Sequence, residues 1–285
     1  MSIIIDPLVD RVKIEFTLNP PEWKTTEFTL EDLAFLDKEC NTVSEFDQTN
    51  KRKQMYDSIV SGEGHVVKFK NKFGQLIIIL ETPEQLEEMP LQLWGRILRM
   101  FYEKSKKPFK VHLLANSSLR LFPKKDKPIE PENINGGYTY RCNPETIIIY
   151  RAEDATRVLI HELQHSCCLD NTNFGIDQIE AETEAWAELI YTALLSEGNP
   201  EIFEELLEKQ SAWIIQQNKQ VRKHMQHPFD FPWRYTIGKE EVWRRWNILR
   251  ITNYKVNLNN SLRLTCPASS YLKEKFDVVQ SSTIL

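Results

Sequence analysis

The chain has 285 residues, of which 41% are hydrophobic and 27% are charged, and its formal net charge is −5. These values are typical of a folded globular protein, and the negative charge argues against general nucleic-acid binding. No apolar run approaches the length of a transmembrane helix, and the first residues lack the basic region of a secretory signal. We therefore expect no membrane partner and a cytoplasmic location.

The cysteine pattern is not typical of a disulfide framework. There are five of them, an odd number, and none forms a C-x-x-C pair. We predict buried free thiols in a reducing compartment. Cys168 follows the histidine motif described below by three residues, and we interpret it as a core cysteine and not as a metal ligand.

The first eighty residues predict helices followed by a hairpin. Residues 11–18 alternate apolar and polar, which favours a strand. A capping pattern predicts a helix over 29–40, and a second helical stretch follows over 44–60. Residues 65–70 and 75–80 flank a glycine turn typical of a hairpin. The second arm of the hairpin is apolar on both faces, so we expect it to lie in the centre of a sheet.

The next seventy residues predict a helix, a strand, a loop and a hairpin. A capping box with proline at the first helical position opens a helix over 83–106. A strand is expected at 109–115, and the proline-rich segment 116–136 reads as a loop. A second hairpin, formed by 137–142 and 146–150, leads directly into the histidine motif.

An HExxH motif, H-E-L-Q-H at 161–165, lies inside a predicted helix that starts at Asp154. Residues four apart share one face of a helix, so His161 and His165 present two imidazoles side by side. Neutral imidazole is a strong zinc ligand. Glu162 can reach a water held by the metal without being a ligand itself. The motif therefore predicts a zinc centre with Glu162 as the general base of a hydrolysis.

A catalytic zinc needs a third protein ligand and one open position. Eighteen residues separate His165 from the run E-A-W-A-E at 184–188. Here the chain resembles the gluzincin metallopeptidases, in which HExxH is followed, after a spacer of this size, by a glutamate on a second helix. Over residues 154–188 this resemblance implies that Glu184 is the third zinc ligand. It also implies that Glu188 is an acid that hydrogen-bonds a ligand histidine.

The amphipathicity of the second helix leaves another ligand open. Its apolar stripe includes Ile179, Trp186 and Ile190. Glu180 flanks this stripe, whereas Glu184 lies further round the helix. By amphipathicity alone Glu180 is the better inward-facing acid, one helical turn before Glu184.

The remaining chain predicts mainly helices. Asn199 can cap, and Pro200 can start, a long helix whose first turns are acidic and whose end is basic. A further helix is expected over 240–249. Residues 250–285 are polar and show no clear period.

The resemblance implies an α+β zincin-like fold. An N-terminal lobe (1–151) with a mixed sheet would lie above a helical lobe (152–285), with the zinc cleft between them. In zincins the sheet edge near the zinc helix binds the substrate backbone as an added strand. Gly137 and Tyr138 are our candidates for this edge, although a plain hairpin is an equally simple interpretation.

Peptide hydrolysis also needs a donor for the developing oxyanion. Gluzincins often take it from a tyrosine or histidine downstream of the third ligand. The candidates here are His224, His227 and Tyr235.

The sequence therefore predicts a metallopeptidase with one zinc per chain that acts on a peptide or protein. Basic groups, among them 104–110 and 124–127, would favour acidic substrates if they border the cleft. One alternative is a zincin-fold binding protein without activity, against which the intact Glu162 argues. Another alternative is a zinc hydrolase of a non-peptide amide.

Overall fold

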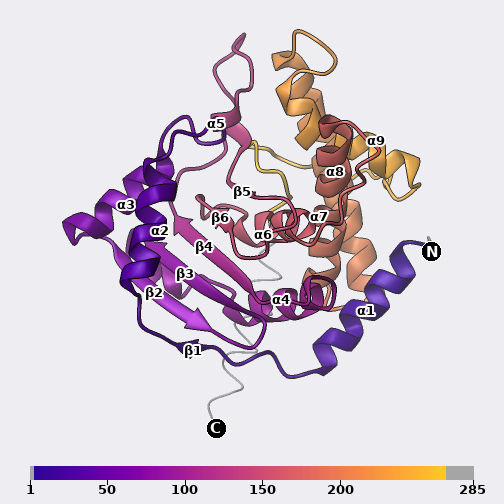
Figure 1. Cartoon of the computed structure of the whole chain (residues 1–285). Helices are drawn as coiled ribbons and strands as arrows, with labels where there is room; N and C mark the ends of the chain where they lie inside the picture. Colours follow the sequence, from indigo (N-terminus) through magenta and orange to yellow (C-terminus); the bar gives the residue numbers. More distant parts are fainter. Residues whose placement is uncertain (1–2, 268–285) are drawn as a thin grey trace.

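A mixed six-stranded sheet organises the N-terminal half of the chain (Figure 1). The computed structural model describes residues 3–267. The strand order is β1-β2-β3-β4-β6-β5, in which β3, β4 and β6 run parallel to one another and the other neighbours pair antiparallel. The strands are β1 (Lys24–Thr25), β2 (His65–Lys70), β3 (Gly74–Leu80), β4 (Phe109–Ala115), β5 (Gly137–Thr139) and β6 (Ile147–Ile149).

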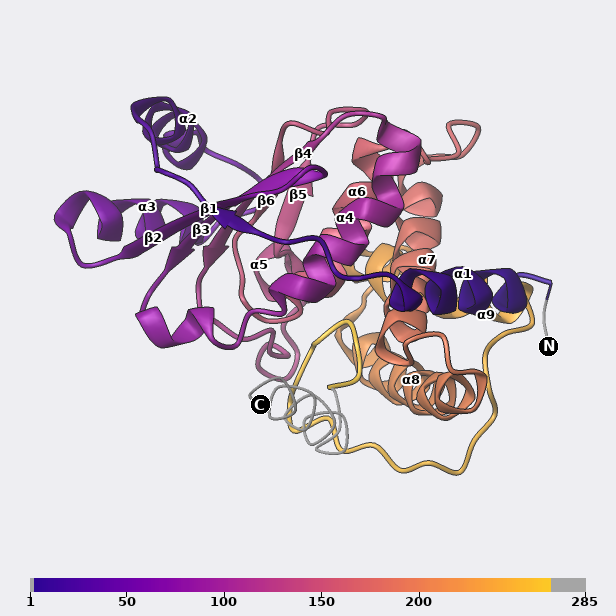
Figure 2. The same cartoon turned by 90° about the horizontal axis from the view of Figure 1, so that it is seen from below.

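Helices cover both faces of the sheet and make up most of the second half. Helices α2 and α3 lie on one face, and α4 and α6 lie on the other, beyond which the remaining long helices pack (Figure 2). The α-helices are α1 (Ile5–Thr17), α2 (Leu30–Asn41), α3 (Lys51–Ser61), α4 (Leu91–Ser105), α5 (Pro131–Ile134), α6 (Ala155–Ser166), α7 (Ile176–Leu195), α8 (Pro200–Val221) and α9 (Ile237–Arg245). Three 3-10 helices are η1 (Pro83–Leu86), η2 (Arg222–His224) and η3 (Phe231–Tyr235).

The apolar run of β3 packs against both helical layers. Ile77 and Ile79 join the core under α2 and α3, while Leu76 and Ile78 join the larger core against α4 and α6. All four side chains are fully buried. Because successive strand residues point to opposite faces, a centrally placed strand must be apolar throughout. The predicted central position of this strand is confirmed.

Local capping explains where two helices begin. Thr29 and Asp32 form the predicted capping box at the start of α2. Asn199 accepts hydrogen bonds from the backbone N–H groups of Glu201 and Ile202 at the start of α8. These contacts satisfy N–H groups that have no partner within the helix.

Several predicted elements differ from the structure. Residues 11–18 are not a strand but the end of α1, because Ile5, Val9 and Val12 form one buried helical stripe. Helix α3 starts only at Lys51. The helix expected over 83–106 is divided into η1 and α4, with Pro90 immediately before α4.

The predicted α+β class is confirmed, whereas the zincin-like arrangement and the two lobes remain predictions. Helix α1 packs beside α7 of the second half. Within residues 3–267, no helix is both long and apolar enough to cross a membrane. The C-terminal stretch from 250 to 267 contains no helix, and the rest of that predicted polar tail lies outside the described residues.

Candidate metal centre and cleft

Helix α6 carries the HExxH motif between the sheet and α7. Leu159, Ile160 and Leu163 are fully buried in the main core, which fixes the rotation of the helix. Asp154 precedes the helix as predicted, but its side chain does not cap the helix. Its carboxylate instead pairs with Arg263 of the C-terminal stretch.

The two histidines of the motif face each other. Nε2 of His161 lies 3.0 Å from Nε2 of His165. Each ring has a carboxylate on its other nitrogen: Nδ1 of His165 lies 2.7 Å from Asp170, and Nδ1 of His161 lies 2.9 Å from Glu184. The Glu184 contact is close but is not aligned as a hydrogen bond. Carboxylates beside Nδ1 favour a proton there and leave the Nε2 lone pairs for a metal.

Glu180 supplies the third donor. Its two carboxylate oxygens lie 3.4 Å from Nε2 of His161 and 3.5 Å from Nε2 of His165. One ligand atom from each of these three residues lies within 4.8 Å of the others, so the cluster can hold a metal ion. Among the described residues this is the only such group of three or more histidine, cysteine or acidic side chains.

The structure places Glu184 differently from the prediction. Glu184 contacts the Nδ1 side of His161 and pairs with the buried guanidinium of Arg157. It therefore occupies the position expected for an acid behind the ligand, one helical turn after the donor. Spacing to the motif favoured Glu184, whereas the apolar stripe of α7 favoured Glu180, and in the structure Glu180 is the acid that faces both Nε2 atoms.

The predicted hydrogen bond of Glu188 to a ligand histidine is not present in the structure. Glu188 is fully buried and contacts no motif histidine in the structure. Its carboxylate accepts from Arg157, Lys239 and Thr265, at 3.3 Å, 3.1 Å and 2.7 Å. Glu188 thus holds Arg157, which in turn holds Glu184 behind His161.

Sequence reasoning missed two residues of this environment, Arg157 and Asp170. Arg157 precedes His161 by one helical turn and so lies on the same face of α6, a signal that helical spacing could have provided. Asp170 follows the end of α6. No regular period reaches it, and only the folded loop brings it to His165.

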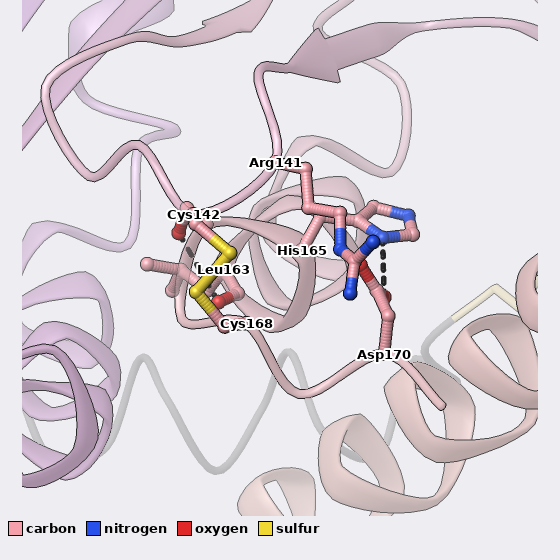
Figure 3. Close-up of a disulfide and its surroundings, with 7 residues drawn as sticks. Arg141, Cys142, Leu163, His165, Cys168 and Asp170 are labelled. Atoms are coloured by element: carbon pink, nitrogen blue, oxygen red, sulfur yellow. Dashed lines mark hydrogen bonds and ion pairs between the residues drawn. A yellow bond between two sulfur atoms is a disulfide. The ribbon is translucent and has the colours of Figure 1, made fainter. Parts of the chain in front are cut away.

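The loop after α6 links His165 to the second hairpin (Figure 3). One carboxylate oxygen of Asp170 lies 2.7 Å from Nδ1 of His165, and the other lies 3.2 Å from Nε of Arg141. Arg141 belongs to the connection between β5 and β6. A disulfide joins Cys142 of this connection to Cys168 beyond the end of α6.

This disulfide corrects the prediction of five free thiols. Among the described residues Cys40, Cys167 and Cys266 remain free. An odd count and the absence of a C-x-x-C pair do not exclude one disulfide between residues that only the fold brings together.

No family model, curated protein or solved structure matches the chain.

The donor set fits a zinc ion. Two imidazole nitrogens and a carboxylate oxygen are zinc donors, and three protein ligands leave the fourth position open, as in catalytic sites. Two nitrogens held about 2.0–2.1 Å from one tetrahedral zinc would lie about 3.3 Å apart. The 3.0 Å separation of the two Nε2 atoms is close to that value.

Glu162 lies beside the metal cluster in the same cleft. The cleft has a volume of about 300 Å³ and is also lined by Gly137, Tyr138 and Tyr235. A Cβ atom on Gly137 would lie 2.6 Å from Cγ1 of Val158 and 3.4 Å from a carboxylate oxygen of Glu162. Glycine at this position therefore lets strand β5 approach the metal-binding helix closely.

Strand β5 is the edge strand of the sheet on the side of the cleft. Tyr150 donates a backbone hydrogen bond to Gly136, and Gly137 pairs with Ile149 in antiparallel register. In this register the backbone groups of Gly137 and Thr139 point away from β6. The edge is thus open to a further strand next to Glu162.

The candidates for an oxyanion donor are separated by the fold. Tyr235 at the end of η3 lines the cleft and is buried. His227 is exposed in a different depression, with Phe229 and Trp233. His224 contacts the backbone carbonyl of Lys127 through Nδ1, outside the cleft. The His227 prediction is therefore not supported, and Tyr235 is retained.

Burial and neighbouring charges give the site residues different pKa values. Burial lowers the pKa of His161 to about 4 and raises the pKa of Glu162 to about 8. Burial also opposes a charge on His165, but the hydrogen bond to Asp170 and the nearby Glu180 outweigh it and raise the pKa of His165 to about 9. Burial raises the pKa of Tyr235 above its ordinary value, so its hydroxyl stays a donor.

The basic groups expected to favour acidic substrates lie elsewhere. Within residues 3–267, no lysine of 104–110 or 124–127 lines the cleft. Lys110 instead pairs with Asp32 at 3.2 Å. The arginines that do line the cleft are Arg52, Arg120 and Arg157, and all three are buried and paired with carboxylates.

Proposed function

We propose that the chain is a zinc-dependent hydrolase of peptide bonds, with His161, His165 and Glu180 as the ligands of one zinc ion. The observation that carries the proposal is the convergence of these donors beside the buried carboxylate of Glu162. A site that only held a metal for structural reasons would need no base there and would use four protein ligands. The HExxH motif that carries the gluzincin resemblance supports the same chemistry, but the third ligand that the resemblance implies, Glu184, lies on the Nδ1 side of His161.

Each residue of the cleft has a chemical role in this proposal. When bound, zinc would polarise the scissile carbonyl and make an attacking water more acidic. Glu162 takes the proton from that water and passes it to the leaving nitrogen. The hydroxyl of Tyr235 donates to the oxygen that becomes negative.

The open edge of β5 would bind the substrate backbone. An extended peptide paired with Gly137 and Thr139 forms main-chain hydrogen bonds and passes its scissile bond next to Glu162. Successive side chains of an extended peptide point to opposite sides. One set therefore faces α6, and the other faces the loop between α2 and α3.

That loop presents an apolar wall to the substrate. Phe46 stacks on Tyr138 with 6.2 Å between ring centroids, and both residues line the cleft. The hydroxyl of Tyr138 accepts from Arg52 at 2.7 Å and donates to Glu39 at 2.9 Å, which fixes the ring. Val43 is 92% exposed on the same rim. The wall favours a bulky apolar side chain over an acidic one at this position of the substrate.

The expected cytoplasmic location stays a prediction. The disulfide between Cys142 and Cys168 removes one of its two reasons, because disulfides persist mainly in oxidising compartments.

Peptide digestion with controlled zinc content tests the proposal. Purified protein is incubated with a mixed peptide library before chelation, after chelation, and after zinc is added back, and the products are read by mass spectrometry. We expect cleavage that chelation abolishes and zinc restores. Zinc binding without cleavage of any peptide would leave the non-catalytic binding protein, or hydrolysis of a non-peptide amide, as the better interpretation.

A further inference from the structure

The Cys142–Cys168 disulfide joins the two segments that carry the metal site. Cys142 lies in the connection after β5, and Cys168 follows the end of α6, with 4.7 Å between the two Cα atoms. Both residues donate a backbone hydrogen bond to the carbonyl of His165, at 2.9 Å and 3.1 Å. The cross-link thus closes around the last turn of the helix that presents His165.

A series of polar contacts runs beside the disulfide. Arg141 precedes Cys142 and Asp170 follows Cys168 by two residues, so the disulfide brings these two side chains together (Figure 3). Asp170 contacts Arg141 and His165 through its two oxygens, and its side chain is almost completely buried. Arg141 is half exposed, so its contact with Asp170 alone is a weak restraint.

The backbone at both cysteines is held in an uncommon conformation. Cys142 has φ of 61° and Cys168 has φ of 57°, in the left-handed region. For residues other than glycine this region is unfavourable and persists where the surroundings fix it. The disulfide is one of the restraints that hold the two loops in this form.

We infer that the Cys142–Cys168 disulfide is a positioning element of the metal site: it holds Asp170 against Nδ1 of His165 and thereby strengthens metal binding. The inference rests on the proposed metal centre. Hydrogen-bond partners of metal-ligating histidines typically change metal affinity by about 10–100-fold. Loss of the cross-link releases the Arg141 segment from the loop that carries Asp170, and zinc then binds more weakly.

The same arrangement makes metal affinity depend on thiol reductants. Two molecules of a thiol donate two electrons to the S–S bond, which breaks to give the thiols of Cys142 and Cys168, and the two reductant sulfurs join in a new disulfide. Both cysteines lie at the exposed surface, so a reductant can reach the bond. Reoxidation by the disulfide form of the reductant restores the Cys142–Cys168 cross-link.

Zinc affinity of serine variants tests the inference without creating free thiols at positions 142 and 168 that could bind the metal themselves. Zinc is titrated in competition with a chromophoric chelator into the oxidised wild type, C142S/C168S, and the control C266S. We expect about 10–100-fold weaker zinc binding by C142S/C168S and no change in C266S. Peptide mass mapping of the wild type verifies the cross-link, and thermal unfolding of the metal-free proteins shows whether each variant is folded.

A cycle with Asp170→Asn separates positioning from general stabilisation. If the disulfide acts through Asp170, removing the disulfide in the Asp170→Asn background costs little further affinity. Equal zinc affinity of folded C142S/C168S and wild type, or fully additive losses in the cycle, would overturn the inference. A wild type that binds no zinc at all would instead overturn the proposed metal centre.

Discussion

The carboxylate of Glu184 lies 2.9 Å from Nδ1 of His161, the ring nitrogen that does not face His165. Glu180, one turn earlier on α7, faces the Nε2 atoms of both histidines. In the proposed metal centre Glu180 is therefore the ligand and Glu184 the supporting carboxylate, whereas the resemblance implied Glu184 and Glu188 for these two roles. Arg157 and Glu188 complete a buried chain of charges behind Glu184.

Substitution of the two acids should separate these roles. Glu180→Ala removes a ligand, so we expect it to empty the zinc site at micromolar zinc. Glu184→Gln removes only the charge behind His161 and should weaken zinc binding by about 10–100-fold. Elemental analysis and zinc titration of the two variants check this, with Glu182→Ala as the matched control on the same helix, because Glu182 pairs with Arg245 and not with a histidine. Loss of zinc in Glu184→Gln but not in Glu180→Ala would restore the assignment implied by the spacing.

Zinc binding should strengthen with pH. The pKa of His165 is raised to about 9, so at neutral pH this ring carries a proton that zinc must displace, whereas His161, with a pKa of about 4, is already neutral. Apparent zinc affinity should therefore rise about tenfold per pH unit between pH 6 and 9 and then level off. Asp170→Asn removes one cause of the raised pKa and should shift the levelling to lower pH. Chelator-buffered zinc titrations measure both curves, and a flat wild-type profile would contradict the assignment.

Tyr235→Phe should lower turnover without emptying the site. The variant loses only the hydroxyl proposed to donate to the oxyanion, so kcat should fall by about 100–1,000-fold while KM and zinc content change little. His227→Ala is the control, because His227 lies in another depression and should leave all three values unchanged. Steady-state kinetics on one library-derived peptide would decide between the two residues.

The aromatic wall of the cleft should set a substrate preference. Phe46→Ala removes a ring that stacks on Tyr138, so cleavage of peptides with a bulky apolar residue at the affected position should fall by about tenfold or more, a loss of roughly 1–3 kcal/mol. Peptides with a small residue there should lose much less. Library cleavage profiles of the variant and of exposed Leu30→Ala as a remote control provide the comparison. Identical profiles would show that the loop between α2 and α3 does not contact the substrate.

The parts of the fold that were predictable depend on local signals. Short-range patterns that favour a single local structure lie where they were expected. They are the capping box of Thr29 and Asp32, the turn at Gly74 and the cap at Asn199. Residues 11–18 alternate as a strand does, but tertiary packing overrides this pattern, because the helix buries Val12 and Glu15 and leaves Ile14 exposed. Extending the pattern back to Ile5 reveals the helical stripe of α1.

The site was predictable only where its residues share one helix. His161, Glu162 and His165 follow from the period of α6. The third donor depends on the rotation of α7 against α6, which family spacing does not determine: Glu184 is buried on α7, yet Glu180 is the acid that faces both Nε2 atoms. The contacts of Asp170 and the Cys142–Cys168 cross-link are made by loops, whose course depends on tertiary packing and not on a local period.

Turnover of zinc-loaded Glu162→Gln tests the central claim most directly. The amide preserves the shape of the carboxylate but cannot accept a proton, and Glu162 is not among the metal donors. The proposed function predicts that this variant binds zinc with wild-type stoichiometry, unfolds at a similar temperature, and loses nearly all peptide cleavage. Cleavage at the wild-type rate by the zinc-loaded variant would contradict Glu162 as the base and, with it, the proposed hydrolytic function of this cleft.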